Sequence, residues 1–302
     1  QEWRTRRMVR LAALASLLAG CSGVSRAAEL PTSPAILQQM RSFSTMGSVL
    51  YIAAHPDDEN TQAITYLARG RGYRTAYLSL TRGDGGLNLL GPQLREQLGV
   101  SRTQELLAAR RLDGGRQDFT RANDFGYSKD YQETLRIWDR RAVLADIVRV
   151  IRSFRPDVIV TRFSPQPGNT HGHHTASTVL AVEAFTLAGD PRAFPEQLGE
   201  LTPWQPKRIL HNVGLGGGGA DAAGGDRAGA MEIEVDGNDP VLGESFASIA
   251  ARSRAMHKTQ GFDVDGGPPG GWRNRGSFLL LGGEPATQDI LDGVDTTWNR
   301  VP

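Results

Sequence analysis

The sequence predicts a three-layer α/β sandwich with a mainly parallel sheet. Short apolar runs alternate with amphipathic stretches of helical length between residues 48 and 213. Apolar runs without polar alternation are typical of parallel strands that are buried on both faces. An alternation of strands and helices is the pattern of proteins whose helices cover both faces of one sheet. The composition agrees, since 39% of the 302 residues are hydrophobic and 22% are charged.

The individual elements follow from this pattern in chain order. A short helix is expected at residues 34–42, because a proline occupies its first position. The predicted strands cover residues 48–54, 75–81, 157–163, 209–213 and 231–235. The predicted helices cover residues 57–69, 101–112, 131–154, 175–187 and 240–259. Glycine-rich residues 214–229 are expected to form loops within one domain that spans residues 34–302.

The first 28 residues are expected to lie outside the fold. Four arginines precede the apolar run of residues 11–20, an order typical of an export signal. That run is too short to cross a membrane as a helix. Residues 18–21 resemble a bacterial lipoprotein processing site, where Cys21 would be acylated, and the alternative is cleavage after Ala27 or Ala28. The sequence therefore predicts an exported protein, either in the bacterial periplasm, as an outer-membrane lipoprotein, or secreted.

Charge and cysteine content narrow the range of partners. The formal net charge is +1, which gives no reason to expect binding to nucleic acid or to an anionic membrane surface. Contact with a membrane is expected only through a lipid on Cys21. Because Cys21 is the single cysteine, no disulfide can form within the chain.

A histidine and three acidic residues follow the first predicted strand. The segment reads His55-Pro56-Asp57-Asp58-Glu59. Open α/β sheets bind ligands beyond the carboxyl ends of their strands, so these side chains are expected in a binding site. Helix capping would explain one or two acids at this place. It does not explain three acids beside a histidine.

Three histidines occupy four consecutive positions just after the strand predicted at residues 157–163. His171 and His174 are three residues apart, so on a helix they share a face and can point into one cavity. Two imidazoles and a carboxylate are a common ligand set for a catalytic zinc that keeps an open position. Surface histidines would explain this motif alone. Its location at the same sheet edge as the acidic motif favours a metal site.

The two motifs together resemble those of the PIG-L/LmbE family of metal-dependent N-deacetylases, of the N-acetylglucosaminyl de-N-acetylase type. The resemblance covers residues 49–187. Residues 82–86 and the pattern Arg102-x-x-Glu105 also match segments that are typical of the family. The resemblance implies a Rossmann-like, LmbE-like sandwich, with residues 34–302 as its catalytic domain.

The resemblance also implies a role for each motif residue. His55, Asp58 and His174 would bind the metal, which is expected to be Zn²⁺, and Fe²⁺ would suit the same ligands. Asp57 would be the general base that activates the metal-bound water. His171 would stabilise the oxyanion or protonate the leaving amine.

One position departs from the family pattern and several others are secondary candidates. The family often has aspartate before the last histidine, where this sequence has His173. An acid at that position would tune the charge of its partner histidine. The candidate substrate-binding residues are Arg82, Asp84, Arg102, Glu105, His173 and His257.

The predicted function is a zinc-dependent hydrolase that removes an N-acetyl or similar acyl group from an amino sugar or glycoconjugate. The substrate would be a small molecule, a glycolipid or a glycan. One alternative is an amidase for another acyl amine or a thiol conjugate. An alternative of another class is an envelope glycan-binding protein with a structural metal. The sequence argues against this last one, because Asp57 would then have no role.

Overall fold

The computed structural model describes residues 32–168, 170–213, 229–262 and 272–301. The chain divides into two units, residues 1–36 and residues 37–302, and the sheet and the site belong to the second. Helix α2 (Ser33–Phe43) crosses the boundary. The predicted export signal over residues 1–28, with Cys21, lies outside the described residues, as do residues 214–228 of the glycine-rich region.

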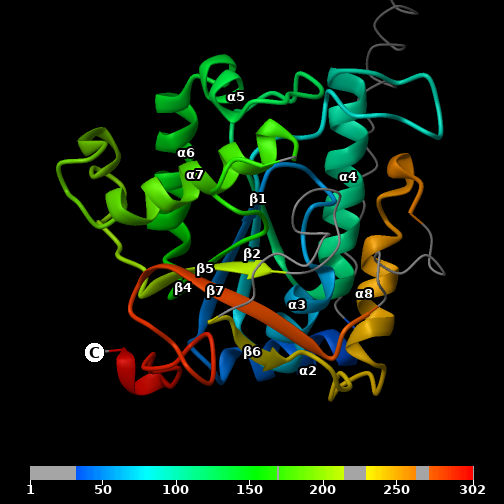
Figure 1. Cartoon of the computed structure of the whole chain (residues 1–302). Helices are drawn as coiled ribbons and strands as arrows, with labels where there is room; N and C mark the ends of the chain where they lie inside the picture. The colour runs from blue at the N-terminus through cyan, green and yellow to red at the C-terminus, as the bar shows by residue number, and fades with distance from the viewer. Residues whose placement is uncertain (1–31, 169, 214–228, 263–271, 302) are drawn as a thin grey trace, which may run out of the picture. The chain divides into compact units, whose positions relative to one another are not determined.

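Seven strands form one sheet in the described part of the chain, in the order β3-β2-β1-β4-β5-β7-β6 (Figure 1). Strands β3, β2, β1, β4 and β5 are mutually parallel, and β7 runs antiparallel to β5 and β6. The strands are β1 (Ser48–Ala53), β2 (Arg74–Ser79), β3 (Arg116–Phe119), β4 (Val158–Thr161), β5 (Arg208–Val213), β6 (Met231–Glu234) and β7 (Arg275–Gly283). The predicted mainly parallel sheet is confirmed.

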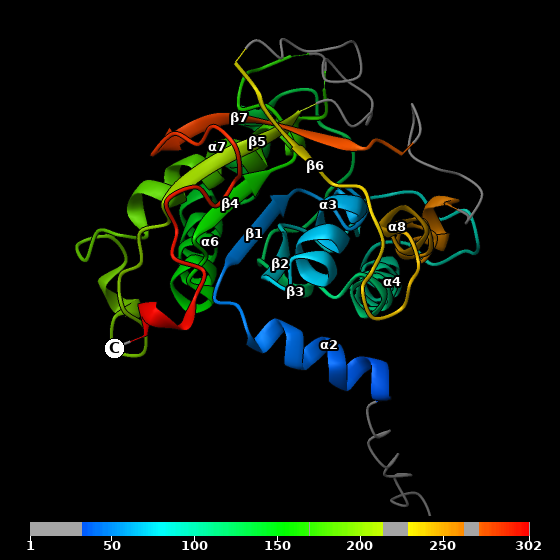
Figure 2. The same cartoon turned by 90° about the horizontal axis from the view of Figure 1, so that it is seen from below.

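Helices cover both faces of this sheet, which completes the predicted three layers (Figure 2). One face carries α5 (Tyr131–Ile137), α6 (Arg140–Phe154) and α7 (Gly172–Leu187). The other carries α3 (Thr61–Thr65), the π-helical turn η1 (Tyr66–Gly70), α4 (Glu96–Asp113) and α8 (Phe246–Arg254). The described residues also form the short 3-10 turns η2 (Pro195–Gln197), η4 (Lys258–Gln260) and η5 (Trp298–Arg300). In the described ranges, no helix has the length and apolar character that a membrane span requires.

The central strand shows why the sheet is buried on both faces. All six residues of β1 are buried. Successive side chains of a strand point to opposite faces, so Leu50 and Ile52 pack with α6 and α7, whereas Val49 and Tyr51 pack with α3 and α4. An uninterrupted apolar run satisfies both layers at once. The parallel strands β1, β2, β4 and β5 therefore end at a common carboxyl edge inside the fold.

The helix predicted over residues 131–154 is two helices in the structure. They are separated at Trp138 and Asp139, where Asp139 has a φ of +54° and its side chain accepts a hydrogen bond from Ala142 N. A positive φ ends one helix, and the aspartate caps the next. The apolar spacing continues through both helices, which is why the break is not visible as a change of pattern.

A buried arginine joins the end of α6 to the loop that follows α7. Arg152 is 1% exposed. It donates to the carbonyl oxygens of Leu187, Ala188, Asp190, Ala193 and Phe194 and to the side chain of Gln197. Each of these oxygens would lose a hydrogen bond without the guanidinium, and leaving a buried acceptor unsatisfied is costly.

We therefore expect Arg152→Met to lower the free energy of unfolding by about 3–5 kcal/mol. Methionine fills much of the volume but donates nothing. Urea denaturation followed by circular dichroism measures the change. Arg149→Met is the matched control on the same helix, because Arg149 is half exposed and pairs with the exposed Glu200. The control should change stability by less than about 0.5 kcal/mol; similar small effects in both variants would contradict the role of Arg152.

Candidate metal-dependent active site

The acidic motif lies in a loop and not in the helix predicted from residue 57. Helix α3 begins only at Thr61, after the Asn60 side chain accepts a hydrogen bond from Ala63 N. Asp57 has a φ of +132°, which no α-helix contains. The loop allows Asp57 and Asp58 to face the carboxyl edge of the sheet, whereas a helix would turn successive side chains by about 100°.

Hydrogen bonds hold this strained loop in place. Asp58 Oδ2 accepts from His55 N at 2.7 Å, and Glu59 Oε2 accepts from Asp57 N at 3.0 Å. The Tyr77 hydroxyl donates to His55 O. A backbone outlier costs about 1–3 kcal/mol and persists only where its surroundings fix it. The two carboxylates that follow Asp57 in the chain, those of Asp58 and Glu59, contribute to that fixation.

Helix α7 brings the histidine motif to the acidic loop. His171 is the N-cap of α7, and His174 lies in its first turn. His174 Nε2 is 3.5 Å from Asp58 Oδ1, and His55 Nδ1 is 3.1 Å from Asp58 Oδ2. One ligand atom from each of these three residues lies within 4.8 Å of the other two. The three residues predicted to bind the metal are therefore close enough to do so.

The ring of His174 is oriented by two neighbours. It stacks on Phe163 with ring centroids 3.7 Å apart and planes 3° from parallel. Thr170 Oγ1 lies 3.2 Å from His174 Nδ1. A hydrogen bond at one ring nitrogen sets the tautomer and leaves the other nitrogen free for a metal. Here that other nitrogen is Nε2, the atom that faces Asp58.

The charge states of two of the three residues, His174 and Asp58, also fit a cation, whereas Asp58 raises the pKa of His55 against the effect of burial. Burial lowers the pKa of His174 to about 3. Against the effect of burial, His174 and His55 hold the pKa of Asp58 well below its usual range. Neutral imidazoles and an ionised carboxylate are the forms that bind metals. Two imidazoles and one carboxylate are also a set found at catalytic zinc sites.

A second group of potential ligands shares His55. It consists of His55, His171 and His173, whose ligand atoms also lie within 4.8 Å of one another. His173 is 0% exposed and does not line the cavity. An ion at this second group would be partly enclosed by protein. The group that contains Asp58 and His174 instead lies entirely on the cavity wall, where a bound ion meets substrate.

Asp57 faces the same cavity and is held by an arginine. Its Oδ1 accepts from Arg102 Nη2 at 2.6 Å, and Arg102 also donates to the carbonyl oxygens of Pro56 and Gly83. Burial raises the pKa of Asp57, and Arg102 opposes that shift. Within the described residues, Asp57 Oδ2 has no hydrogen-bond partner. One carboxylate oxygen is thus anchored and the other is available.

The glycines of residues 82–86 make room for these partners. A Cβ atom at Gly83 would lie 2.3 Å from Arg102 Nη1, and one at Gly86 would lie 2.5 Å from the same atom. A Cβ at Gly85 would lie 2.5 Å from Asp124 Oδ1. Side chains at Gly83 or Gly86 would displace the arginine that anchors Asp57, and a side chain at Gly85 would clash with Asp124. The glycine-rich loop after β2 is therefore part of the site through its backbone.

His257 has a different place from the one predicted for it. It is 1% exposed and does not line the cavity. Its Nε2 lies 2.9 Å from Glu59 Oε1, which also accepts from Arg110 Nη2 at 3.0 Å. His257 therefore supports the carboxylate that holds the Asp57 backbone, and the prediction that it contacts substrate is not supported.

Four more of the predicted substrate-binding residues lie away from the cavity. Arg82 is exposed and its guanidinium lies over the ring of Phe119. Asp84 lines a separate hollow. Glu105 accepts hydrogen bonds from the backbone and hydroxyl of Thr259, which joins α4 to η4.

His173 is the fourth. Its ring packs against Phe125 and Trp138, and its Nδ1 is 3.0 Å from His55 Nε2. His173 thus contacts the proposed metal ligand His55 without lining the cavity. Of the six predicted substrate-binding residues, Arg102 is the one that reaches the cavity.

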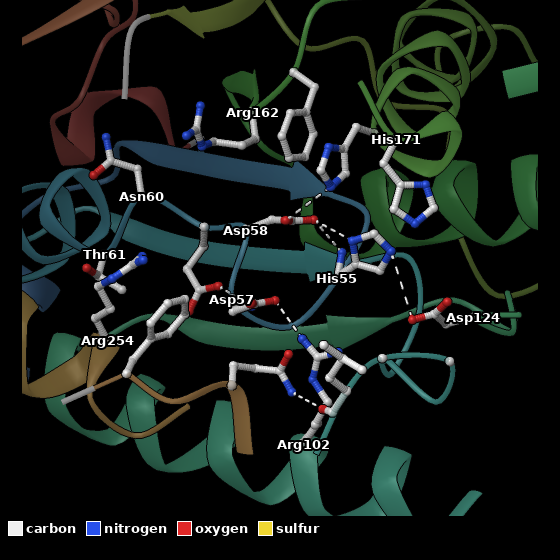
Figure 3. A pocket seen from close by; sticks show the side chains of 18 of the residues that line it. His55, Asp57, Asp58, Asn60, Thr61, Arg102, Asp124, Arg162, His171 and Arg254 are labelled. Carbon is white, nitrogen blue, oxygen red and sulfur yellow. Dashed lines mark hydrogen bonds and ion pairs between the residues drawn. The ribbon is translucent and has the colours of Figure 1, made fainter. Parts of the chain in front are cut away.

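Other cavity residues have no counterpart in the motifs. The cavity has a volume of about 610 Å³ (Figure 3), and its wall includes Asp124, Tyr127, Arg162, Phe163, Arg254, Phe262 and Trp272. Asp124 Oδ1 is 3.7 Å from His173 Nδ1, so a carboxylate reaches the histidine pair from a loop after β3. Arg162 and Phe163 directly follow β4. The rule that ligands meet the carboxyl ends of strands could have identified these two, as it did His55.

Comparison with known proteins finds matches over the part of the chain that carries both motifs. The family model for PIG-L, GlcNAc-PI de-N-acetylase, matches residues 50–185, which include both motifs. A 1D-myo-inositol 2-acetamido-2-deoxy-alpha-D-glucopyranoside deacetylase of Streptomyces scabiei is 31% identical over 182 residues, 54% of this chain and 55% of that protein. A mycothiol S-conjugate amidase of Streptomyces coelicolor is 28% identical over 55% of this chain and 61% of its own length. This chain thus spans less than two thirds of either relative.

Solved structures agree on the fold. An N,N'-diacetylchitobiose deacetylase from Pyrococcus horikoshii superposes with a TM-score of 0.55 at 18% identity, over 81% of this chain and 86% of the other. The 4-carboxy-2-hydroxymuconate hydratase GalB from Pseudomonas putida KT2440 gives a TM-score of 0.53 at 16% identity, over 81% of this chain and 99% of the other. These neighbours differ in reaction, so the likeness carries the fold alone. The match of residues 50–185 to the PIG-L family model bears out the resemblance seen in the sequence, and the solved structures bear out the fold.

Proposed function

We propose that this chain is a zinc-dependent hydrolase that removes the N-acetyl group from an N-acetylglucosamine-type compound. The observation that carries the proposal is the position of Asp57, with one free carboxylate oxygen, beside the ligand cluster of His55, Asp58 and His174 in a single cavity. The cavity volume of about 610 Å³ lies in the range of small-molecule sites. The names of the relatives give further support, because they include deacetylases that act on an acetamido sugar.

The residues of the chain divide the work of amide hydrolysis. A zinc ion held by His55, Asp58 and His174 would supply a Lewis acid that lowers the pKa of water to about 7. Asp57 takes the proton from the attacking water through Oδ2, while Arg102 fixes its other oxygen. The amide is thereby converted to acetate and a free amine, and the proton on Asp57 is available for the departing nitrogen.

His171 is suited to the oxyanion. Its Nδ1 accepts a hydrogen bond from His173 N at 3.2 Å, which places the ring proton on Nε2. His171 also lines the cavity. An N–H donor that points at the place where negative charge develops stabilises the transition state. Of the two roles predicted for His171, stabilisation of the oxyanion is the one that this hydrogen bond favours.

The direct test is acetate release by the metal-loaded full chain. N-acetylglucosamine and N-acetylglucosaminyl inositol are incubated with the protein, and acetate and free amine are measured. We expect equal amounts of both products from at least one of these sugars. The proposal fails if the metal-loaded protein releases acetate neither from these two sugars nor from N-acetylated sugars that carry an acidic group.

A second candidate is an amidase for thiol conjugates, which the similarity to a mycothiol S-conjugate amidase favours. A mycothiol S-conjugate belongs in the same assay. Cleavage of the conjugate without acetate from either sugar would favour this amidase. A protein that binds metal but cleaves none of the three would instead fit the glycan-binding alternative.

A further inference from the structure

One arginine of the cavity wall has a fixed position. Arg254 is the last residue of α8 and is half-buried on the wall. Its guanidinium carbon lies 3.8 Å from the centre of the Phe262 ring, a stacking distance. An arginine whose guanidinium stacks on an aromatic ring has lost much of its conformational freedom before any ligand arrives. Such preorganisation favours binding.

Arg254 differs from Asp57 and Glu59 of the same cavity, which form ion pairs with residues of opposite charge. Asp57 pairs with Arg102, and Glu59 pairs with Arg110 and His257. Among the described residues, no carboxylate lies within ion-pair distance of Arg254. Its Nε is buried and has no hydrogen-bond partner there.

The isolated cation is costly in the free protein. Burial lowers the pKa of Arg254, although Asp57 and Glu59 act in the opposite direction. Arginine nevertheless stays charged in proteins. A half-buried guanidinium that lacks both an ion pair and one hydrogen bond gains most from a ligand that supplies them, and carboxylate and phosphate groups have the matching geometry.

Arg254 lies away from the histidine cluster at which the amide bond would be cleaved. In the view of Figure 3, Arg254 lies to the left of Asp57, whereas His55, His171 and Asp124 lie to its right. Arg162 lines the same cavity and adds a second positive charge close enough to influence Arg254. An anionic group bound here would therefore belong to a part of the substrate remote from the N-acetyl group.

We propose that the substrate is an N-acetylated amino sugar that carries a carboxylate or phosphate substituent, and that Arg254 binds this anionic group. The inference rests on the proposed deacetylase function and adds the charge class of its substrate. The carboxylates near Arg254 do not need it as a counterion, because Arg102 and Arg110 already serve Asp57 and Glu59.

Matched sugars test this proposal with the metal-loaded full chain. N-acetylglucosamine is neutral, N-acetylmuramic acid adds a carboxylate, and N-acetylglucosamine 6-phosphate adds a phosphate. We expect kcat/KM for acetate release to be about 10- to 100-fold higher for at least one anionic sugar than for the neutral one. The two anionic sugars distinguish the carboxylate from the phosphate.

The variants identify the residue responsible. Arg254→Gln should abolish the preference mainly through a higher KM for the anionic sugar, and Arg254→Lys should keep part of it. Arg252→Gln is the control on the same helix, since Arg252 pairs with Glu244 and does not line the cavity. It should keep the wild-type preference. Equal kcat/KM for neutral and anionic sugars in the wild type, or an unchanged preference in Arg254→Gln, would overturn the proposal.

A direct binding measurement separates this inference from the proposed reaction. If none of the three sugars releases acetate, the deacetylase proposal fails, and calorimetric titration of N-acetylmuramic acid and N-acetylglucosamine 6-phosphate still tests the anion site. Binding of either anionic sugar that exceeds binding of N-acetylglucosamine, and that is lost in Arg254→Gln, supports the site. Equal binding of all three sugars, or no binding of either anionic sugar, refutes it.

Discussion

Replacing Asp57 by asparagine is expected to lower kcat by about 10²- to 10⁴-fold, the range that a general base contributes. Asparagine keeps the shape of the side chain and an oxygen that can accept from Arg102, but it cannot take a proton. It also tolerates a positive φ about as well as aspartate does, so the loop should keep its conformation. Rates of acetate release measured at saturating substrate would give the change.

Two controls make this result specific. Zinc content of Asp57→Asn should match that of the wild type, because Asp57 is not among the ligands proposed for the metal. Asp146→Asn removes a carboxylate that pairs with the exposed Arg121 outside the cavity and should leave kcat unchanged. A kcat within about threefold of wild type in Asp57→Asn would show that another group takes the proton.

The second large effect concerns metal content. His174→Ala removes one of three ligands, and we expect the metal, measured by elemental analysis after dialysis, to fall from about one ion per chain to nearly none. Loss of an outer-shell partner alone costs about 10- to 100-fold in affinity, and loss of a direct ligand should cost more. The same measurement identifies zinc or iron.

His171→Ala decides between the two possible ligand groups around His55. If the ion sits with Asp58 and His174, His171→Ala keeps its metal and loses turnover. If it sits with His171 and His173, the pattern reverses: His171→Ala loses the metal and His174→Ala keeps it. Metal retained in both variants would contradict both assignments.

The parallel part of the sheet was predictable because its central strands are all buried on both faces. Burial on both faces requires β1 and its neighbours to be largely apolar, and that is visible without any knowledge of partners. The polar edge strand β3 (Arg116–Phe119) lacks this signal, since its residues are half-buried or exposed. Strand β7 (Arg275–Gly283) follows a stretch without a regular pattern. Both strands depend on pairing with distant segments, which the local sequence does not show.

The cluster of His55, Asp58 and His174 was predictable for a related reason. Residues at the ends of parallel strands meet at one edge, and their chemistry restricts what they can bind. His173 and His257 show the limit of that reasoning. Which histidine faces the cavity and which lies behind it depends on the direction of each side chain, and this is set by tertiary packing against Trp138 and Glu59.

Arg254 is the converse case, a cavity residue that no sequence motif predicted. It sits at the end of α8 without a motif around it, and it reaches the cavity only because α8 packs against α3 and α4. The helix predicted over residues 240–259 includes it, but helix periodicity alone gives no reason to connect that segment with the metal motifs, which lie about 200 and about 80 residues earlier in the chain.

The support of Glu59 by His257 defines how much of the chain a working enzyme requires. The family model ends at residue 185, yet the backbone of Asp57 is held by Glu59, and Glu59 is held by a residue that follows α8. A shortened expression fragment that stops after β5 would leave Glu59 without that histidine and would remove one support of the acidic loop. Strand β7 (Arg275–Gly283) also pairs with both β5 and β6, so the minimal autonomous unit extends at least through Gly283, and fusion or truncation designs should keep that boundary intact.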